Sequence, residues 1–386
     1  MPIKIKSTSG GSVTIDVPST AVDTTMMLPV TNAGLVSNTN PVMTGNVAIT
    51  GNVSVTGTGS YISISGNNIS PYAMRNRIIN GNHKVDQRNS YASVNFQQGY
   101  TYPCDRWRMF KDSTTVANGT VQVVSDAPTG FANSVRVTIT TTQTSPIGSS
   151  NLISMLEQSI EGHNISDLNW GTSNASPVTL SFWVKSSVTG TYTVTLNRFS
   201  TDYTYPTTYL VNSSNTWEYK SISIPGPTVG SWDSTNGPGV YVIYNMFCSA
   251  ANTTSSSDAW VQGRYFSVSG STNLAATNGA TWQIAGVQLE KGSTATPFEF
   301  RPYGTELALC QRYYYKLTGG ARAFGAQAIT SYMNWFLPVV MRAAPTVTAG
   351  TSADYTGATS YADAFYFYKS GTYAVIGDGQ QWSAEL

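Results

Sequence analysis

Acidic side chains are the residues of this sequence whose spacing could support bond cleavage. Glu157 and Glu161 are four positions apart in a segment, residues 152–161, for which a helix is predicted. They would share one face of that helix. Asp202 lies among aromatic residues, and Asp233 lies in a turn-rich stretch. Two carboxyl groups about 5 to 10 Å apart can cleave a glycosidic bond. We expect instead that the glutamates form a solvated helix face and that Asp233 lies in a loop, so no catalytic residue is predicted.

Motifs for nucleophiles, metals and cofactors are missing from the sequence. It contains no Gly-x-Ser-x-Gly elbow, no His-x-x-x-His pair and no phosphate- or dinucleotide-binding glycine loop. The two histidines, His83 and His163, are expected to be turn or surface residues. Cys104, Cys248 and Cys310 are far apart and odd in number, so we expect buried small apolar side chains rather than a zinc site or disulfides. The sequence therefore predicts no enzyme, no metal and no cofactor.

Aromatic side chains next to short polar ones offer a different chemistry, the binding of carbohydrate. Sugar rings stack their C–H faces on Trp and Tyr, while their hydroxyls hydrogen-bond to Asn, Asp, Gln and Arg. Residues 199–209 hold such a mixture and are expected to form a loop. Tyr203 and Tyr205 of this loop are therefore candidate receptor contacts, with packing into a core as the alternative.

The aromatic residues near the end of the sequence supply the other candidate contacts. Residues 365–368 alternate Phe and Tyr, so in a strand the phenylalanines would share one face and the tyrosines the other. We expect the phenylalanines inside, and Tyr366 and Tyr368 exposed. Trp335 and Trp382 are further candidates, for which core packing or contacts between chains are the alternative.

The composition indicates which elements must hold these side chains. The chain has 386 residues, too many for one compact domain, and only 11% are charged. Its wealth of Ser, Thr, Asn, Gly and Tyr favours strands and turns, so the fold class is predicted to be all-β. A net charge of +1 with scattered Lys and Arg excludes a basic stripe for nucleic acid or for an anionic membrane surface. No apolar run is long enough for a signal peptide or membrane insertion.

The first 76 residues are predicted to form two elongated parts. Residues 1–39 contain alternating runs at 12–17 and 24–30, which predict two strands too few to make a core. They are interpreted as a segment that attaches to a partner. Within residues 40–76 the pattern Gly-Asn-Val-x-[Ile/Val]-Thr recurs with a period of six. Such short strands need stacking and neighbouring chains to bury their apolar face, which favours a repetitive trimeric β-shaft over a glycine-rich linker.

The remaining chain is predicted to form two domains. Residues 77–303 carry alternating segments at 119–124, 134–140, 178–185, 190–196 and 218–224, with Asn-Gly turns beginning at 80, 118, 236 and 278. This pattern predicts a β-sandwich of jelly-roll size. Residues 304–386 open with a helical turn that places Leu307, Cys310 and Tyr314 on one face and Glu306 near its positive end. A small aromatic β tip domain should follow.

Eight blocks between residues 76 and 345 have a shared order in one known group of proteins. They are Asn76-Arg-Ile-Ile-Asn-Gly-Asn82, Asp105-Arg-Trp107, Leu180-Ser-Phe-Trp-Val-Lys-Ser186, Trp217-Glu-Tyr-Lys220, Gly286-Val-Gln-Leu-Glu-Lys-Gly292, Thr296-Pro-Phe-Glu-Phe-Arg-Pro302, Cys310-Gln-Arg-Tyr-Tyr-Tyr315 and Leu337-Pro-Val-Val-Met-Arg-Ala-Ala-Pro345. Together they resemble a widespread phage tail-fibre and receptor-binding module. The resemblance implies a jelly roll like that of carbohydrate-binding modules, in a homotrimeric fibre. It departs at residues 83–88, where the family usually has apolar residues and a Trp, so that strand should pack differently.

These observations favour a non-enzymatic phage tail fibre that adsorbs to the host cell through a surface glycan or protein. Its expected partners are two further copies of itself and, through residues 1–39, a tail or baseplate protein. The expected location is the virion, after assembly in the host cytoplasm. Two other readings stay open: a structural tail appendage or capsid decoration without receptor binding, and a glycan depolymerase or free glycan-binding protein.

Overall fold

The chain divides into two units, Met1–Ser63 and Ile64–Leu386. The computed structural model describes residues 3–6, 12–15, 74–112, 117–143, 153–198, 203–319, 321–324, 330–351, 353–370 and 373–386. In the first unit, β1 (Ile3–Lys6) pairs antiparallel with β2 (Ser12–Ile15), which lies within the strand predicted over 12–17. The strand predicted over 24–30 and the repeats lie outside the described residues. Attachment, shaft, trimer and the domain boundaries at 39, 76 and 303 stay predictions.

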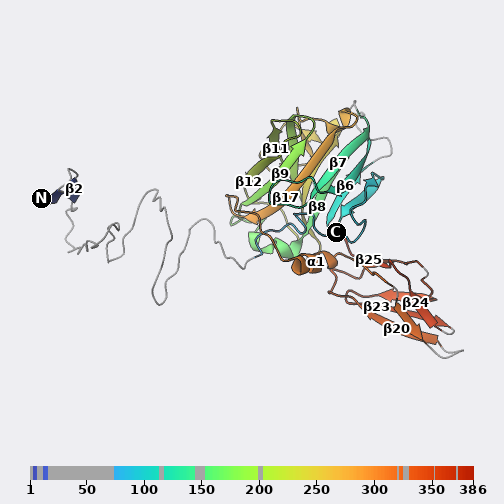
Figure 1. Cartoon of the computed structure of the whole chain (residues 1–386). Helices are drawn as coiled ribbons and strands as arrows, with labels where there is room; N and C mark the ends of the chain where they lie inside the picture. The colour runs from blue at the N-terminus through green and yellow to red at the C-terminus, as the bar shows by residue number, and fades with distance from the viewer. Residues whose placement is uncertain are drawn as a thin grey trace. The chain divides into compact units, whose positions relative to one another are not determined.

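Two antiparallel sheets of the second unit form a β-sandwich (Figure 1). The seven-stranded sheet has the order β15-β11-β10-β13-β8-β5-β4. Its strands are β4 (Gly99–Cys104), β5 (Trp107–Lys111), β8 (Ile153–Glu161), β10 (Gly190–Arg198), β11 (Tyr203–Val211), β13 (Pro238–Cys248) and β15 (Val261–Gln262). The six-stranded sheet has the order β12-β9-β17-β7-β6-β3. Its strands are β3 (Val94–Asn95), β6 (Asn118–Val124), β7 (Ser134–Thr141), β9 (Val178–Ser186), β12 (Glu218–Ile224) and β17 (Thr281–Lys291).

The chain passes back and forth between these two sheets. For example, β8, β10 and β13 belong to the seven-stranded sheet, while β9, β12 and β17 between and after them belong to the other. This alternation is the connectivity of jelly-roll sandwiches. All five strands predicted by period-two patterns are confirmed as β6, β7, β9, β10 and β12. Four short 3₁₀ helices and a two-stranded parallel pair fill the connections: η1 (Gly162–Asn164), η2 (Ser166–Leu168), η3 (Ala250–Asn252), η4 (Leu274–Ala276), β14 (Thr253–Thr254) and β16 (Ser267–Val268).

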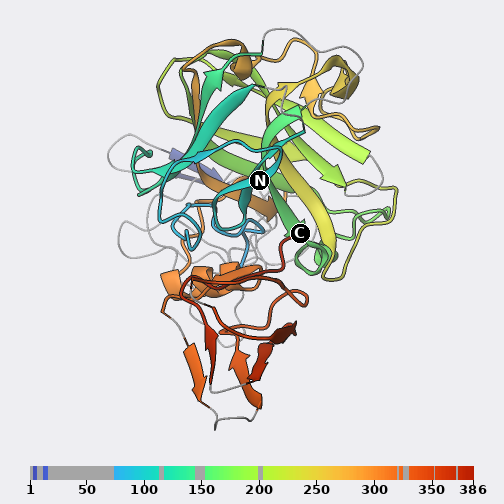
Figure 2. The same cartoon turned by 90° about the vertical axis from the view of Figure 1, so that its right-hand side faces the viewer.

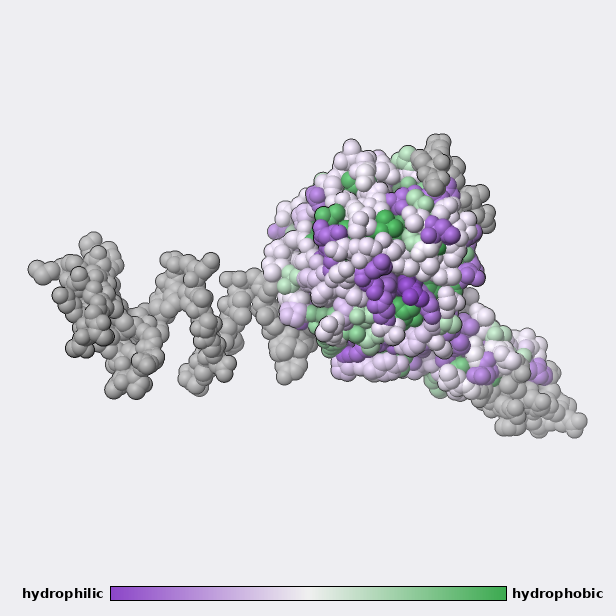
Figure 3. Space-filling view, turned by 45° about the horizontal axis from the view of Figure 1, so that its top comes forward, coloured by the Kyte–Doolittle hydropathy of each residue, from purple (hydrophilic) through white to green (hydrophobic). Residues whose placement is uncertain are grey.

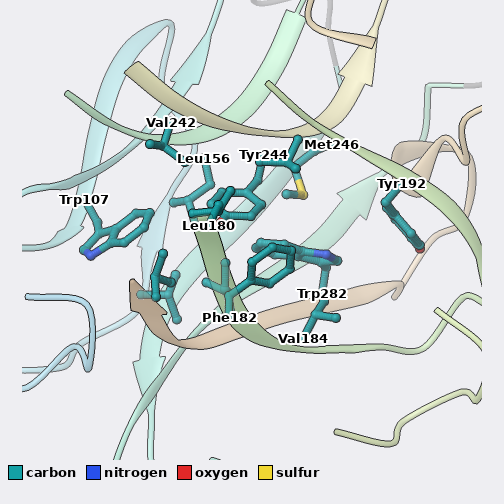
Figure 4. Packing of buried hydrophobic residues seen from close by; sticks show 14 of the residues in the cluster. Trp107, Leu156, Leu180, Phe182, Val184, Tyr192, Val242, Tyr244, Met246 and Trp282 are labelled. Atoms are coloured by element: carbon teal, nitrogen blue, oxygen red, sulfur yellow. The ribbon is translucent and has the colours of Figure 1, made fainter. Parts of the chain in front are cut away.

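The core of the sandwich lies between the sheets, where alternate side chains from both meet. Figure 4 shows Trp107, Leu156 and Tyr244 from one sheet packed with Phe182 and Trp282 from the other. Each of these five side chains is fully buried. Burying a large apolar side chain contributes about 1.5–3 kcal/mol. The interface between the sheets therefore holds the rigid frame on which the outer faces are built.

Two local predictions within the sandwich are wrong. Residues 153–161 form strand β8 rather than a helix, and they pair with β5 on one side and β13 on the other. Because both faces of β8 are buried, no clean alternation of apolar and polar residues marks it as a strand. The Asn118-Gly119 turn signal instead lies inside β6, at a shift in its register with β7.

The first block of the resemblance connects the beginning of the sandwich to its last strand. The Asn76 side chain donates to the carbonyl of Val287 at 3.0 Å and accepts from the amide of Leu289 at 3.1 Å. The Asn80 side chain donates to the carbonyls of Val85 and Asp105 at 2.8 and 2.9 Å. Both asparagines are buried, so these bonds replace hydration that the loop backbone loses.

His83 closes the turn that begins at Asn80, as expected of a turn residue, but it is not on the surface. Its ring is fully buried and lies 5.2 Å from the Trp107 ring. Burial lowers its pKa from 6.5 to about 3, so the imidazole is neutral near pH 7. His163 is exposed in η1, as predicted.

The C-terminal part begins with α1 (Tyr303–Gln311) and continues as small sheets, seen in orange to red in Figure 2. Their orders are β18-β25-β21, β19-β24 and β20-β23-β22. The strands are β18 (Tyr314–Lys316), β19 (Ala321–Phe324), β20 (Thr330–Phe336), β21 (Thr346–Thr348), β22 (Gly357–Ser360), β23 (Ala364–Ser370), β24 (Tyr373–Ile376) and β25 (Gln381–Ser383). A separate core of Leu317, Met341, Phe365, Phe367 and Trp382 holds them together.

Residues of α1 join this part to the sandwich. Cys310 is buried in one cluster with Ile79 and Val85, and Leu307 packs against it. Glu306 accepts from the main-chain amide of Asn80, so it ties the helix to the sandwich rather than serving only its own positive end. Tyr314 belongs to β18 instead of the helix.

Candidate functional site

The outer face of the seven-stranded sheet carries a hollow of about 100 Å³, here called the sheet groove. Five neighbouring strands and the loop after β15 build it. Its lining residues are Tyr100, Phe110, Met155, Glu157, Asn197, Tyr241, Ile243, Arg264 and Phe266. The alternation of strands explains their direction, because Leu156 and Val242 point into the core and their neighbours therefore point outward.

Apolar side chains form the floor of the sheet groove, and one ring stands at its edge. Met155, Tyr241, Ile243 and Phe266 make a cluster separate from the sandwich core. Tyr100 on the edge strand β4 is 51% exposed, and its ring centroid lies 5.1 Å from that of Phe110. The groove thus combines a buried apolar base with an aromatic face that solvent reaches.

A charged pair lies beneath that aromatic edge. The Arg108 Nε donates to the Glu157 carboxylate at 2.7 Å, and the two side chains are only 6% and 3% exposed. The guanidinium carbon lies 4.0 Å from the Tyr100 ring centroid and 5.6 Å from that of Tyr241. Burial raises the pKa of Glu157, and it raises the pKa of Tyr241 to about 12. Although burial alone would lower the pKa of Arg108, the adjacent Glu157 carboxylate raises it above its ordinary value.

A second hollow, of about 290 Å³, shares Tyr100 with the sheet groove. We call it the junction cleft, because Tyr314 and Gln381 of the C-terminal part line it together with sandwich residues. Its central feature is Arg88, whose guanidinium carbon lies 4.1 Å from the Tyr102 ring centroid and 3.6 Å from that of Tyr314. Polar and aromatic groups therefore continue from the sheet groove across Tyr100.

Tyr203 and Tyr205 do not lie in a loop, so that prediction is wrong. Residues 203–211 form β11, which pairs along its whole length with β10. Tyr205 is buried in the sandwich core. Tyr203 is half-buried and stacks on Trp260 with ring centroids 5.5 Å apart. With Trp170 and Trp232, the Trp260 ring closes one edge of the sandwich. Neither tyrosine is among the residues that line the sheet groove.

The four C-terminal candidates separate into interior and exposed side chains. Trp382 is fully buried in the C-terminal core and stacks on Tyr315, and Trp335 is half-buried against the same core. The alternation of residues 365–368 is confirmed, because both phenylalanines are buried while Tyr366 and Tyr368 lie on the opposite face. Tyr368 is 36% exposed. A receptor role for any of the four stays a prediction.

The acidic candidates serve structural roles in the described chain. Glu157 and Glu161 are buried on strand β8 rather than on a solvated helix face, which corrects that prediction. Hydrogen bonds from Arg312 and Tyr313 outweigh the effect of burial and lower the pKa of Glu161. Asp233 accepts from the amide and hydroxyl of Thr235, so it stabilises a turn. Asp202 lies outside the described residues.

The remaining side chains offer no ligand set among the described residues. Cys104 and Cys310 are buried as predicted, whereas Cys248 is half-buried. No group of three or more His, Cys, Asp or Glu in the described ranges could hold a metal ion. Within the same ranges, no helix has the length and apolar character needed to cross a membrane.

Sequence reasoning missed the residues that form the sheet groove. Tyr100, Phe110 and Tyr241 come from three separate strands, and no spacing in the sequence shows that β13, β8, β5 and β4 are neighbours. One signal was present. Trp107 and Met109 alternate with Arg108, which places a charged residue on the outer face of a strand.

Neither a protein-family model nor a curated protein matches the chain. Several solved structures do. One is the enzymatically active domain of tailspike protein 4 from bacteriophage CBA120, at 14% identity, covering 48% of this chain and 19% of that one, with a TM-score of 0.28. The chain thus spans about a fifth of the tailspike's length. Another is the family 11 carbohydrate-binding module of Lic26A-Cel5E from Clostridium thermocellum, at 13% identity, covering 52% and 100%, with a TM-score of 0.26.

A third solved structure is the tandem CBM22 domain of Xyn10C from Paenibacillus barcinonensis. It is 10% identical, covers 78% of this chain and 100% of that chain, and has a TM-score of 0.26. At these values the similarities carry no argument about function. The sandwich and its groove are therefore described from the chain's own strands and side chains.

Proposed function

We propose that this chain is the host-recognition part of a bacteriophage tail fibre, and that its sheet groove binds a glycan of the bacterial surface. The observation that carries the proposal is the exposed Tyr100 ring, held over the Arg108 guanidinium at the edge of an apolar hollow. An exposed aromatic face beside fixed polar groups suits a sugar ring, which has both an apolar face and hydroxyls.

The lining of the groove supports carbohydrate over a purely apolar ligand. Asn197, Glu157 and Arg264 supply amide, carboxylate and guanidinium groups around the apolar floor. Because Arg108 and Glu157 neutralise each other, the floor itself favours neither sign of charge. The surface also fits a carbohydrate ligand. Figure 3 shows a face of mostly intermediate hydropathy with small, mixed hydrophilic and hydrophobic patches.

The proposal includes assembly as a homotrimer that docks on the virion tail through residues 1–39. Three weak sites on one fibre would act together, because binding of the first raises the effective concentration of the others. A structural tail appendage or capsid decoration without receptor binding is the second candidate. It would leave the exposed ring of Tyr100 without a ligand.

A catalytic role is not part of the proposal. Cleavage of a glycosidic bond needs two carboxyl groups on either side of the scissile bond. Within the described residues, Glu157 is the one carboxylate that lines the sheet groove, and it is bound to Arg108. We propose that the protein binds glycan reversibly and releases it unchanged.

Two measurements on the full-length protein test this function. Light scattering should give a mass near three times 41.4 kDa. An array of bacterial surface polysaccharides should bind the protein, and Tyr100→Ala should lose most of that signal. Tyr219→Ala is the matched control, because Tyr219 is 46% exposed on the other sheet. Equal binding by both variants would exclude the sheet groove as the site, and a monomeric protein would exclude the trimeric fibre.

A further inference from the structure

Three tyrosines share one exposed face of the C-terminal sheet β20-β23-β22. Tyr332 on β20 is directly opposite Tyr368 on β23, and Tyr366 lies two residues before Tyr368 on the same strand. The Tyr332 ring centroid lies 5.8 Å from that of Tyr366 and 5.9 Å from that of Tyr368. Tyr332 is 62% exposed. Together with Asn334 and Thr359, these residues are called the tyrosine face.

The fold keeps this face outside. Phe365 and Phe367, which alternate with the tyrosines on β23, fill the C-terminal core on the opposite side of the sheet. Because successive side chains of a strand point to opposite faces, only a shift of one residue in the register of β23 would bring the tyrosines inside. Such a shift would remove the phenylalanines from the core. Clustered exposed aromatic rings are uncommon on soluble proteins and mark binding surfaces.

The neighbours of the rings indicate the chemistry of the ligand. Asn334 and Thr359 are the cross-strand partners of Tyr366 on either side, so an amide and a hydroxyl flank the central ring. The ion pair of Lys369 with Asp354 follows the alternation of Phe365 and Phe367 and therefore belongs to the other face of the sheet. Such a face offers apolar stacking and neutral hydrogen-bonding groups, which fits a neutral sugar chain better than an acidic one.

The size of the face argues against a second copy of the chain as its occupant. A stable protein–protein interface uses roughly 20–30 residues on each side and about 800 Å² per partner. The tyrosine face consists of five side chains on three short strands. With Phe336, which is 74% exposed and lies on the same side of β20, the face still has far fewer residues than such an interface uses.

We propose that the tyrosine face is a second carbohydrate-binding site, for a neutral glycan chain that lies along β23. The site is separate from the sheet groove, and sugar binding by this face can be measured alone. Only its role in adsorption to a host cell rests on the proposed function. A fibre with two sites per chain would hold a long polysaccharide at two points. Loss of either site would then weaken adsorption without abolishing it.

Nuclear magnetic resonance on the full-length protein tests the site directly. The probes are cellohexaose, maltohexaose and β-1,4-galactohexaose as neutral chains, with hexagalacturonate as the acidic one. We expect at least one neutral hexaose to shift the ring signals of Tyr332, Tyr366 and Tyr368 at millimolar concentration, and hexagalacturonate to shift them less. The absence of a shift with all three neutral probes overturns the proposal, as does a larger shift with the acidic probe.

Variants separate this site from the groove. Tyr332→Thr with Tyr368→Thr should weaken binding of the active hexaose at least tenfold, since threonine keeps the strand propensity while removing the rings. Tyr219→Thr on β12 is the control for an exposed strand tyrosine, and Tyr100→Ala should leave the shifts of the Tyr332, Tyr366 and Tyr368 ring signals unchanged. Loss of binding in Tyr100→Ala alone would assign the hexaose to the sheet groove. A change in the oligomeric mass of the double variant would assign the tyrosine face to contacts between copies; either result overturns the proposal.

Discussion

Arg108 on β5 and Glu157 on β8 form a buried ion pair on the outer face of the seven-stranded sheet, with the Arg108 Nε 2.7 Å from a carboxylate oxygen. The two strands are neighbours, and the residues are opposite each other in their register. Both side chains are almost fully buried, so each charge is stabilised mainly by the other, and Arg108 also donates to the main-chain oxygen of Leu386. The pair also fixes the guanidinium beneath Tyr100, which connects the stability of the sheet to the shape of the groove.

Arg108→Met should therefore destabilise the protein strongly. It removes the charge and leaves Glu157 buried without its cation, for which a loss of about 3–5 kcal/mol is expected. The double variant Arg108→Met with Glu157→Met removes both charges and should recover most of that loss. Urea unfolding of the full-length variants measures both values. If the double variant is as unstable as the sum of the single ones, the two residues do not act as a pair.

Gly81→Ala should destabilise the start of the sandwich. A methyl group at residue 81 would lie 2.1 Å from the carbonyl oxygen of Val287, which is main chain and cannot move aside. The loop and β17 would have to separate, and the bond from the Val287 amide to the Gly81 carbonyl at 2.9 Å would weaken. We expect a loss of at least about 2 kcal/mol, as for other strained packing changes.

Gly304→Ala is the matched control for that substitution. Gly304 lies in α1, and an added methyl group there meets nothing within 4 Å. Alanine loses less backbone entropy than glycine in a helix, so a gain of about 0.5–1 kcal/mol is expected. The same chemical change should thus shift the thermal midpoint in opposite directions at the two positions. A decrease of similar size at both would mean that close approach at Gly81 is not the cause.

The sequence identified strands correctly where one face of the strand is buried and the other faces solvent. Val121 and Val123 alternate with Thr120 and Gln122 in β6, and this pattern identified the strand correctly. The same reasoning failed in β8. Glu157 follows the core residue Leu156 and therefore has the pattern of a polar surface residue, but it is buried on the other face of the strand. A charge buried by its partner on another strand has no local signature.

The sites show the same division. Residues 365–368 could be assigned to inside and outside from their own alternation, so Tyr366 and Tyr368 were placed correctly. Tyr332, which completes the tyrosine face, was not identified, because its register with Tyr368 depends on the pairing of strands 36 positions apart. Trp382 could not be separated from surface tryptophans, since its burial depends on the whole C-terminal core.

Asp105 should make the stability depend on pH between about 4 and 7. Burial raises its pKa from 3.8 to about 7, more than Arg88 and Gln87 lower it. Within that interval the folded state holds a proton that the unfolded state releases. Stability from this group therefore falls as the pH rises, by on the order of 4 kcal/mol over the whole interval.

The comparison with Asp105→Asn isolates this effect. His83 acts in the opposite direction, because its pKa is lowered to about 3 and the unfolded state takes up the proton below pH 6.5. The two contributions partly cancel in the unsubstituted protein. Subtracting the unfolding free energies of Asp105→Asn from those of the unsubstituted protein, measured from pH 4 to 8, should leave a curve that falls with pH. A flat difference would show that Asp105 is ionised throughout.

Glu218 should stabilise the protein above pH 4.5 and lose that effect in acid. Burial alone would raise its pKa, but Lys220 and the main-chain amides of Ser213 and Asn212 outweigh it and lower the pKa to about 2. The carboxylate accepts from both amides at 2.8 Å and so closes the turn between β11 and β12. Because the folded pKa is depressed, the unfolded state binds the proton first, and the stabilisation declines as the pH falls from about 4.5 to 2. Glu218→Gln should thus lower the thermal midpoint at pH 7 and have little effect at pH 2.5, whereas an equal decrease at both values would mean that the turn depends on the shape of the side chain and not on its charge.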